Sequence, residues 1–420
     1  MQASPTLKLH ALSNPSFRAI LLALAGVPIA AAYLWRGVIQ PLVFGTYLGD
    51  LQESYLRAAG RIASGADPYD LCKTMGCLEP TGPQYVTPPL VAWMAQPLLG
   101  LDGHLVSAVV AIVLNVSLGV FLFSALRALK VTDRHLAVLL ILMALAFEPV
   151  IGNIDEGQVN LVLLGLSGIW LAAWVDGRWW GGVAVGAAIA LKLIQGPTAL
   201  LVFWARRWLM FSVAAVAGVV LWLLAVPQYL VEYLTKVLPE VSQGTGFYEN
   251  HSPGGTVARL IDPSTFLGAT RGSPEGARAI TIVIGVAAIV ITLWALRSPS
   301  STRMGRALEA AVVTALGPIV ASYSWGTHLV LLLLPMLVLV VWGIERRSWG
   351  LIALVAAGWI SIGPVHKGLQ VLLVSGYSNL VVLRALTELS MIGVLAIWIA
   401  CVIAVRRDHV LPGVGAAQTR

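Results

Sequence analysis

Two carboxylic acids follow the first long apolar stretch of the chain, which covers residues 19–38. Asp50 and Glu53 are three positions apart, at the place where a membrane helix emerges into water. A carboxylate at such a boundary can be a plain helix-capping or interfacial charge. It can also be a general base whose pKa is tuned by partial burial. The features of the other segments decide between these two interpretations.

The composition places the chain in a membrane. Of its 420 residues, 58% are hydrophobic and only 11% are charged, whereas about a quarter of the residues are charged in a soluble domain. The net charge of +7 comes from basic residues at the ends of apolar runs, as orientation signals do. Nucleic-acid binding is excluded because no basic patch is interleaved with aromatic residues. We expect an all-α polytopic integral membrane protein.

A transmembrane helix needs about twenty apolar residues. The sequence predicts about ten full spans, with short half-helices that bring the total to 10–13 membrane segments. The full spans are 19–38, 104–127, 134–151, 158–175, 209–226, 278–297, 308–323, 327–344, 349–363 and 384–405. The shorter apolar pieces are 88–101, 180–193 and 196–205, which we interpret as half-helices, a re-entrant pair or interfacial helices.

The distribution of basic residues predicts the orientation of these spans. If the N-terminus is cytoplasmic, every basic cluster lies on the cytoplasmic side, and so does the C-terminus. The clusters are Arg127, Lys130 and Arg134; Arg206 and Arg207; Arg297, Arg303 and Arg306; Arg346 and Arg347; and Arg406 and Arg407. Residues 1–420 then form one membrane domain, with two long outer (periplasmic) loops at 39–87 and 227–277. Functional residues tend to lie on loops over a rigid scaffold, so we expect the site outside.

The first outer loop contains an interfacial helix and a pair of cysteines. Apolar residues recur at helical spacing over 50–64, with polar residues between them, which is typical of a helix that lies on the membrane surface. Cys72 and Cys77 could form a small disulfide if this loop is outside the cytoplasm. Cys401 lies in the last apolar run, where we expect it to fill the core.

Several short motifs follow one another along most of the chain in the order found in a known family. They are the aspartate after the first span, Gly65-Ala66-Asp67-Pro68-Tyr69, Tyr85 before Pro88-Pro89, Gly157-Gln158-Val159-Asn160, Leu191-Lys192-Leu193 with Pro197, Asn250-His251-Ser252-Pro253 and Ser324-Trp325-Gly326-Thr327-His328. This ordered set resembles glycosyltransferase family 87, which belongs to the C-type superfamily of membrane glycosyltransferases. The chain departs from the family's tighter Tyr-Pro-Pro motif, because Val86 and Thr87 follow Tyr85.

The resemblance implies the C-type fold and a specific reaction. A sugar, usually mannose, would move from a polyprenyl-phosphate donor to a lipid-linked glycan acceptor such as a phosphatidylinositol mannoside or lipomannan. The reaction would occur on the outer face of the plasma membrane, without a cofactor. Asp50 occupies the position of the family's base, and His328 occupies the position of a second site residue. Arabinofuranose transfer from a polyprenyl-phosphate donor remains an alternative, and we expect a monomer.

This chemistry suits a single carboxylate. Phosphate is a competent leaving group, so the reaction needs a base for the acceptor hydroxyl and cations around the phosphate. No paired aspartates typical of a metal site are evident, so we expect no metal. One base without a second nucleophile indicates direct displacement with inversion, and Glu53 is the only nearby acid that could act as a partner.

The candidate ligands of the two substrates are spread over the outer side. Arg57 could bind phosphate or merely reach the lipid headgroups. Lys192, at membrane depth, could bind the donor phosphate, snorkel to the interface or form an internal ion pair. His328 could be a substrate contact or an ordinary interface residue, and His366 could add positive potential. The candidate substrate-binding residues are Glu53, Arg57, Tyr85, Gln158, Asn160, Lys192, Asn250, His251, Arg259, His328 and Lys367.

Two other functional classes fit a polytopic protein. A transporter or flippase for lipid-linked glycans would also have half-helices at mid-depth, but such proteins usually contain an internal repeat of spans, and we find none in the sequence. A structural subunit would have no need of the carboxylate-rich outer loops that this chain carries. The sequence therefore favours a glycosyltransferase.

Overall fold

The computed structural model describes residues 15–69, 85–225, 227–267, 273–377 and 381–410. These residues form helices joined by short connections, and the described part of the chain contains no strand. This confirms the all-α prediction. Cys72 and Cys77 lie outside the described residues, so their predicted disulfide stays a prediction. Cys401 is fully buried, as expected of a residue that fills the core.

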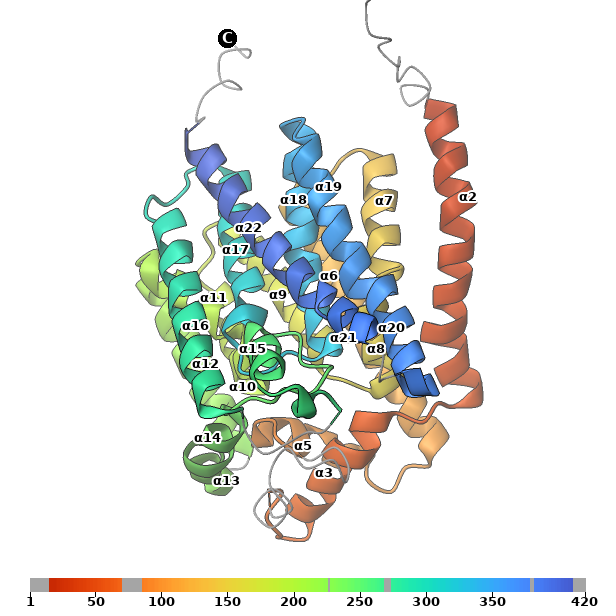
Figure 1. The fold of residues 1–420 in the computed structure, drawn as a ribbon, viewed down its shortest axis with the longest axis vertical. Helices are drawn as coiled ribbons and strands as arrows, with labels where there is room; N and C mark the ends of the chain where they lie inside the picture. Colours follow the sequence, from red (N-terminus) through yellow and green to blue (C-terminus); the bar gives the residue numbers. More distant parts are fainter. Residues whose placement is uncertain (1–14, 70–84, 226, 268–272, 378–380, 411–420) are drawn as a thin grey trace, which may run out of the picture.

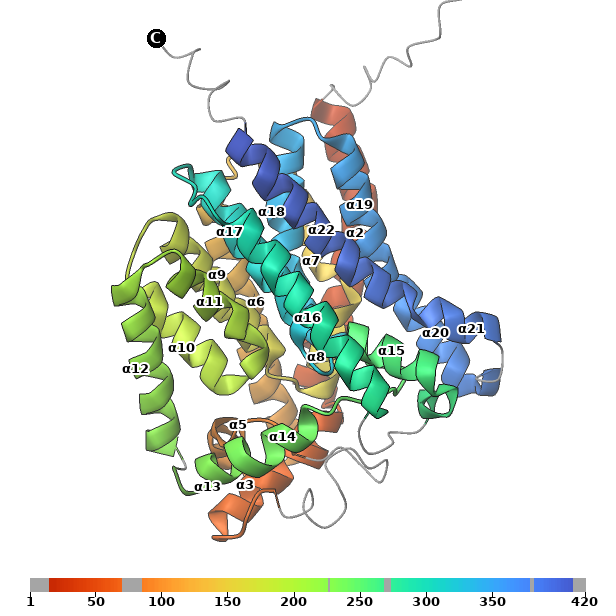
Figure 2. The same cartoon turned by 60° about the vertical axis from the view of Figure 1, so that its left-hand side comes forward.

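The elements follow one another as a series of helices with short 3-10 or π-helical segments, which are labelled η (Figures 1 and 2). The first half contains α2 (Pro15–Tyr33), η1 (Leu34–Phe44), η2 (Leu51–Tyr55), α3 (Leu56–Ala63), α5 (Pro89–Ala95), η3 (Gln96–Leu98), α6 (Gly103–Ala128), α7 (Arg134–Leu145), α8 (Glu148–Glu156), α9 (Asn160–Val175), α10 (Gly181–Leu191), η4 (Leu193–Gln195), α11 (Gly196–Trp204) and α12 (Trp208–Ala225). The second half contains α13 (Pro227–Glu232), η5 (Tyr233–Val237), α14 (Leu238–Val241), α15 (Pro253–Ile261), η6 (Pro263–Phe266), α16 (Glu275–Ala295), α17 (Arg303–Val320), η7 (Gly326–Leu332), α18 (Leu333–Glu345), α19 (Trp349–Ile360), η8 (Ser361–Val365), α20 (His366–Leu372), η9 (Leu373–Tyr377), α21 (Val381–Thr387) and α22 (Leu389–Val410).

The basic connections meet at one end of the bundle, which we call the basic end. Helix α2 begins there and α22 ends there (Figure 1). Direct contacts join the connections: Arg207 donates to the carbonyl of Trp174 at 2.9 Å, and Arg346 pairs with Asp408 at 3.0 Å. Arg303 also bonds to the carbonyl of Ala128 at 2.6 Å. The predicted grouping of basic residues is therefore a property of the fold, whereas its cytoplasmic location stays a prediction.

Fewer helices than expected are long and apolar enough to cross a membrane. The described residues contain seven, or eight if α7 and α8, which are bent by 48°, count as one span. The predicted count of about ten is not confirmed for two further reasons. Helix α9 has only 16 residues, and α17 begins with Arg303, Arg306 and Glu309. Both helices are largely buried against other helices, so neither has to match the lipid along its whole length.

Helices α10 and α11 form a short pair that enters the bundle from the basic end and returns to it (Figure 2). Lys192 breaks the helix with extended backbone angles at the end of α10, and Gly196 and Pro197 start α11. This is the arrangement expected for segments 180–193 and 196–205. The side chain of Lys192 is 8% exposed, so the turn between the helices brings an ammonium group inside the protein.

Close approach of helix backbones holds the pair in place. A Cβ added at Gly182 or Gly186 of α10 would overlap with the backbone of α12. Gly165 and Gly168 of α9 also lie close to the backbone of α6, at Ser117 and Phe121. Small residues at such crossings are typical of helix packing in membranes, where van der Waals contact replaces the hydrophobic effect.

The opposite end of the bundle carries the short helices. There α3, α5, α13 and α14 gather (Figure 1). Segment η2–α3 confirms the helix expected over 50–64, with Ala58 and Ala59 buried and Arg57 exposed. The first loop begins after Phe44 rather than at residue 39, because η1 continues the first span. The loop expected over 227–277 contains α13, α14 and α15.

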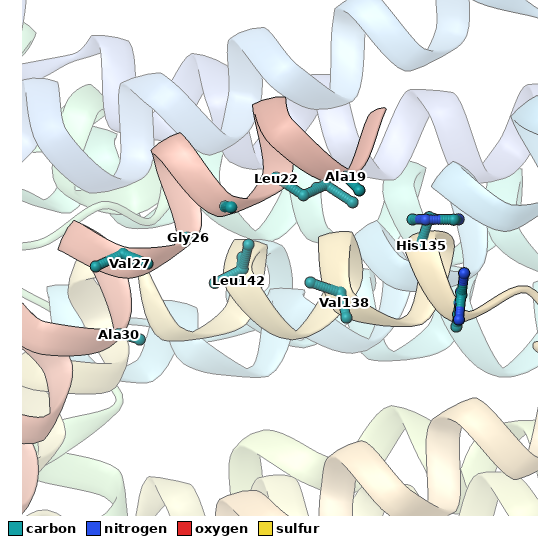
Figure 3. A pocket seen from close by; sticks show the side chains of 10 residues that line it. Ala19, Leu22, Gly26, Val27, Ala30, His135, Val138 and Leu142 are labelled. Atoms are coloured by element: carbon teal, nitrogen blue, oxygen red, sulfur yellow. The ribbon is translucent and has the colours of Figure 1, made fainter. Parts of the chain in front are cut away.

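An open apolar groove lies between α2 and α7, near the basic end (Figure 3). Arg134 and His135 lie where α7 begins, and Leu142 packs against Gly26 of α2. The groove is separated from Asp50 by the length of η1, so it does not contain the acids singled out above. Its lining residues are Ala19, Leu22, Ala23, Gly26, Val27, Ala30, Arg134, His135, Val138 and Leu142.

We predict that Gly186→Val destabilises the fold, because the added side chain would overlap with the backbone of α12 at Ala214. Overpacking of this kind costs about 1–3 kcal/mol. Gly119→Val in α6 is the matched control, since a Cβ there meets no atom within 4 Å. Thermal unfolding in detergent should show a lower midpoint for Gly186→Val alone. Equal midpoints for the two variants would contradict the close packing of α10 on α12.

Candidate active site

Asp50 lies at the turn that joins the first span to η2. Gly45, with φ +71°, reverses the chain after Phe44, and Leu48 and Leu51 are buried on either side of the turn. Although Asp50 is the N-cap residue of η2, its side chain makes no capping hydrogen bond. The simple capping interpretation is therefore not supported, and the carboxylate is directed elsewhere.

The carboxylate of Asp50 accepts a hydrogen bond from the side-chain amide of Gln158. Gln158 lies two residues before the start of α9. The Oε1 atom of Gln158 accepts from the Tyr55 hydroxyl at 2.7 Å and from Lys192 Nζ at 3.3 Å. Lys192 Nζ also donates to Asn160 Oδ1 at 3.0 Å. Three segments that are far apart in sequence thus meet in one network, which we call the Asp50–Lys192 network: Asp50, Tyr55, Gln158, Asn160 and Lys192.

The surroundings of Asp50 make its carboxylate more basic than usual. Burial raises the pKa of Asp50, and the nearby Glu53 raises it further, while the Gln158 hydrogen bond and the Lys192 charge act in the opposite direction. A carboxylate with a raised pKa takes up a proton more readily. The Gln158 hydrogen bond and the Lys192 charge favour the deprotonated form of Asp50, which is the form that a general base needs.

Three further acids surround Asp50. Glu53 accepts a hydrogen bond from the Tyr47 hydroxyl. Glu156 lies beside Gly49, at the end of α8, and Glu249 is close enough for its charge to interact with that of Asp50. Burial raises the pKa of Glu249, which accepts from Gln370 Nε2 at 2.8 Å. The sequence singled out only Glu53, although Glu156 and Glu249 directly precede the Gly157-Gln158 and Asn250-His251 motifs.

Tyr85 belongs to an aromatic cluster next to the network. Its ring packs edge-on against Tyr55 with centroids 6.1 Å apart and stacks on Tyr69 at 5.4 Å. Its hydroxyl donates to the carbonyl of Pro88 and accepts from the backbone N–H of Ala92 at 3.0 Å. Tyr85 therefore fixes the start of α5 beside the site, and a contact with substrate stays a prediction.

His328 lies near the ammonium of Lys192. It is 3% exposed, and its Nδ1 accepts from the backbone N–H of Trp325 at 3.3 Å. The imidazole of His328 is close enough to interact electrostatically with the charge of Lys192. The ring centroids of His328 and Tyr323 are 6.0 Å apart. The structure thus brings His328 towards the same network as Asp50, Gln158, Asn160 and Lys192.

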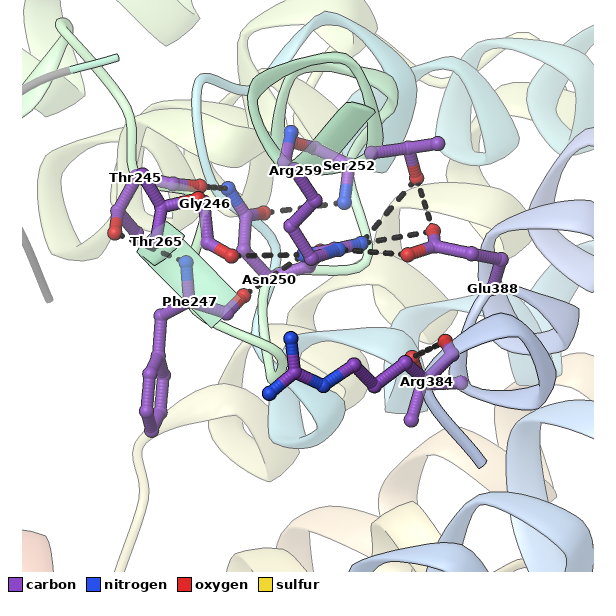
Figure 4. A network of polar contacts seen from close by, with 12 residues as sticks. Thr245, Gly246, Phe247, Asn250, Ser252, Arg259, Thr265, Arg384 and Glu388 are labelled. Atoms are coloured by element: carbon purple, nitrogen blue, oxygen red, sulfur yellow. Dashed lines mark hydrogen bonds and ion pairs between the residues drawn. The ribbon is translucent and has the colours of Figure 1, made fainter. Parts of the chain in front are cut away.

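Arg259 and Asn250 hold the long outer loop together (Figure 4). The guanidinium of Arg259 bonds to both carboxylate oxygens of Glu388, at 2.6 and 2.8 Å, and to the carbonyl of Phe247 at 2.8 Å. Asn250 donates to the carbonyl of Thr245 at 2.7 Å. These contacts give both residues a structural role, and their predicted contact with substrate stays a prediction.

Lys367 and Arg57 occupy more open positions. Lys367 Nζ lies 3.5 Å from a carboxylate oxygen of Glu148 and 3.4 Å from Oε1 of Gln370, which in turn binds Glu249. It therefore joins α20 to α8 beside the site. Arg57 is exposed on α3, and its charge interacts with the hydroxyl of Tyr47. Both could reach a lipid phosphate, and that role stays a prediction.

His251 is buried in the long outer loop. Its backbone N–H donates to the carbonyl of Ser324 at 2.8 Å, and its ring meets that of His366 with centroids 4.4 Å apart. Sequence reasoning missed this pairing, because His251 and His366 are far apart along the chain. Among the described residues there is no group of three or more His, Cys, Asp or Glu side chains that could hold a metal ion.

We predict that Glu388→Ala destabilises the outer loop, because it leaves the 7%-exposed Arg259 without its carboxylate partner. Removing one member of a buried pair costs about 3–5 kcal/mol. The double variant Arg259→Met with Glu388→Met should recover most of this loss. Glu240→Ala, which removes an acid from the same loop, is the control. Thermal unfolding of Glu388→Ala at the wild-type midpoint would contradict the structural role.

Three relatives share part of this chain. A polyprenol-phosphate-mannose-dependent alpha-(1-2)-phosphatidylinositol pentamannoside mannosyltransferase from Mycolicibacterium smegmatis is 28% identical over 65% of the chain and 67% of its own length. A polyprenol-phosphate-mannose-dependent alpha-(1-2)-phosphatidylinositol mannoside mannosyltransferase from the same organism is 31% identical over 52% of each chain. An alpha-(1->3)-arabinofuranosyltransferase from Mycobacterium tuberculosis is 34% identical over 27% of each chain. The matched part spans about two thirds of the first relative and half of the second.

A comparison with family models extends beyond the short motifs described above. The family model of glycosyltransferase family 87 matches residues 85–322. This range includes Gln158, Asn160 and Lys192 but begins after Asp50. The family match therefore does not cover Asp50, and what links Asp50 to the matched region is its contact with Gln158 and the nearby charge of Lys192. The match covers more than half of the chain and confirms the resemblance seen in the motifs. The chain therefore belongs to glycosyltransferase family 87.

Proposed function

We propose that this protein is an inverting glycosyltransferase that moves mannose from a polyprenyl-phosphate donor to a lipid-linked glycan acceptor. An acceptor of the phosphatidylinositol mannoside or lipomannan type fits the names of the mannosyltransferase relatives. One observation carries this proposal. The Asp50 carboxylate and the Lys192 ammonium bind the same amide, that of Gln158, so a base and a phosphate-binding cation lie side by side.

The reaction follows from this arrangement. Asp50 takes the proton of the acceptor hydroxyl as its oxygen bonds to the anomeric carbon of the donor sugar. The bond between that carbon and the phosphate oxygen breaks, and the polyprenyl phosphate leaves with the electron pair. Lys192, with His328 beside it, stabilises the negative charge on the phosphate. A single displacement at the anomeric carbon inverts its configuration.

Two polar groups near the network are suited to the sugar. Asn160 is fully buried, and its Nδ2 atom has no hydrogen-bond partner among the described residues. A buried amide without a partner costs about 1–3 kcal/mol, and a sugar hydroxyl would provide the missing acceptor. Gln158 binds both Asp50 and Lys192, so it lies between the proposed base and the proposed phosphate-binding group.

The position of the basic end supports an active site on the outer face of the plasma membrane. Asp50 lies at the far end of the first span from the basic connections. Because basic connections favour the cytoplasm, both termini would be cytoplasmic and Asp50 periplasmic. Nucleotide sugars are not available there, which favours a lipid-borne donor. We propose that a monomer embedded in membrane lipids is sufficient for the reaction.

Arabinofuranose is the second candidate for the transferred sugar, because an arabinofuranosyltransferase is among the relatives. Mannose is favoured because the mannosyltransferases match more of the chain, 65% and 52% against 27%. The decisive experiment supplies purified protein with polyprenyl-phosphate mannose or polyprenyl-phosphate arabinofuranose and a phosphatidylinositol mannoside. Mass spectrometry should detect an acceptor lengthened by one hexose. No product with any polyprenyl-phosphate sugar would contradict the proposal.

We predict that Asp50→Asn lowers kcat by about 10²–10⁴, which is the usual contribution of a general base. The asparagine keeps the size of the side chain but cannot take the proton. Asp102→Asn provides a matched control, because Asp102 caps α6 with a hydrogen bond to the backbone N–H of Leu105 and asparagine caps equally well. Turnover of Asp50→Asn at the wild-type rate, with an unchanged melting midpoint, would show that Asp50 is not the base.

The raised pKa of Asp50 predicts the acid limb of the pH–rate profile. The base acts only when it is deprotonated, so the rate should fall about tenfold per pH unit below the pKa of Asp50. In Gln158→Met the hydrogen bond that lowers this pKa is lost, so the acid limb should move to higher pH. Gln243→Met, in the outer loop, is the control. An acid limb of Gln158→Met at the wild-type pH, or at a lower pH, would contradict the assignment.

A further inference from the structure

Two buried histidines on separate segments aim their Nε2 atoms at one place. His251 comes from the long outer loop and His366 begins α20, and their exposed fractions are 1% and 9%. Their rings meet at nearly right angles, 83°, with centroids 4.4 Å apart. A Cβ added at Gly326 would lie 3.1 Å from His366 Nε2 and 3.9 Å from His251 Nε2. Gly326 therefore lies close to both nitrogen atoms, and a side chain at this position would crowd them.

The His251 Nε2 atom has no hydrogen-bond partner among the described residues, although it is buried. Buried polar groups are almost always satisfied, and an orphan of this kind costs about 1–3 kcal/mol. Burial, together with His366 and Arg259, lowers the pKa of His251 well below the usual value. A neutral imidazole can donate or accept one hydrogen bond at this atom, which suits a hydroxyl group.

The surroundings of the pair belong to the active site. Glu249, two residues before His251, interacts with the charge of Asp50, and it accepts a hydrogen bond from Gln370 of α20. That bond ties the loop to the helix that carries His366. Gly326 lies two residues before His328, which interacts with Lys192. The histidine pair is therefore flanked by the elements that surround Asp50.

The chemistry around the two histidines favours a neutral sugar over a phosphate. The cations nearest the pair, Arg259 and Lys367, already pair with Glu388 and Glu148. The carboxylate of Glu249 would repel a phosphate, and Lys192 binds Gln158 beside Asp50. Trp325, directly before Gly326, packs with Tyr323 at 5.4 Å and with Phe247 at 6.2 Å between centroids. Ligand sites commonly combine such aromatic surface with a few convergent polar groups.

We propose that His251 and His366 bind hydroxyl groups of the acceptor's terminal sugar and so hold it over Gly326 for attack. This inference rests on the proposed function and adds an acceptor subsite to it. The two histidines act by positioning: the Nε2 atoms fix the sugar ring, while Asp50 takes the proton. The donor phosphate lies at Lys192, so the two substrates meet at Asp50 from different elements.

The test separates the two substrates kinetically. In His251→Phe and His366→Phe, the KM for phosphatidylinositol mannoside should rise about tenfold, because the sugar hydroxyls lose their partners. The KM for polyprenyl-phosphate mannose should not change. His366→Gln, whose amide can take the place of Nε2, should recover most of the acceptor affinity, whereas His366→Asn should not. His135→Phe, at the basic end, is the matched control.

A binding measurement keeps this proposal distinct from the proposed function. Titration of the wild-type protein with phosphatidylinositol mannoside in detergent, without donor, should show binding by native mass spectrometry, and binding by His251→Phe should be about tenfold weaker. An unchanged acceptor affinity in both phenylalanine variants would mean that the pair holds only water, and would overturn the proposal. An equal change in the donor KM would overturn it as well. Failure of the proposed function would appear separately, as wild-type protein without turnover.

Discussion

The arrangement of this protein depends on one shared amide. Gln158 donates to the carboxylate of Asp50 through Nε2 and accepts from the ammonium of Lys192 through Oε1. A direct ion pair would neutralise both charges, and each would then be less available to a substrate. Separated by a neutral amide, the carboxylate can take a proton and the ammonium can stabilise a phosphate. Because buried charges without partners are costly, the amide also allows the fold to keep both groups.

The fold explains how Lys192 reaches that amide. The break between α10 and α11 ends the helix at Lys192, inside the bundle. The ammonium group of Lys192 therefore lies within hydrogen-bonding distance of Gln158. The glycines of α10 allow it to pack closely on α12. Asn160, at the start of the buried α9, accepts a hydrogen bond from Lys192. The site therefore depends on short helices that are shielded from lipid by longer ones, and irregular backbone at that depth is tolerated only inside protein.

The sequence predicted the part of the site that follows from motif order and charge. Asp50, Gln158, Asn160 and Lys192 were all named, and the structure joins them, because polar residues at membrane depth are costly and seldom without a role. Tyr55 lies in the interfacial helix predicted over 50–64, and the apolar spacing of that segment does not indicate that its hydroxyl binds Gln158. Glu249 directly precedes the Asn250-His251 motif, but its interaction with Asp50 and the contact between His251 and His366 arise from packing of distant segments, which no local pattern reveals. The predicted count of about ten spans is not confirmed, because α9 and α17 are buried against neighbouring helices and are not long and apolar enough to count as spans.

The most direct test of this account is a cryo-electron microscopy structure of Asp50→Asn with polyprenyl-phosphate mannose bound. The inactive variant should retain the donor. We predict that the phosphate lies within hydrogen-bonding distance of Lys192 Nζ and that the anomeric carbon faces residue 50. A phosphate bound away from Lys192, for instance at Arg57, or an anomeric carbon that faces away from residue 50, would contradict the central claim.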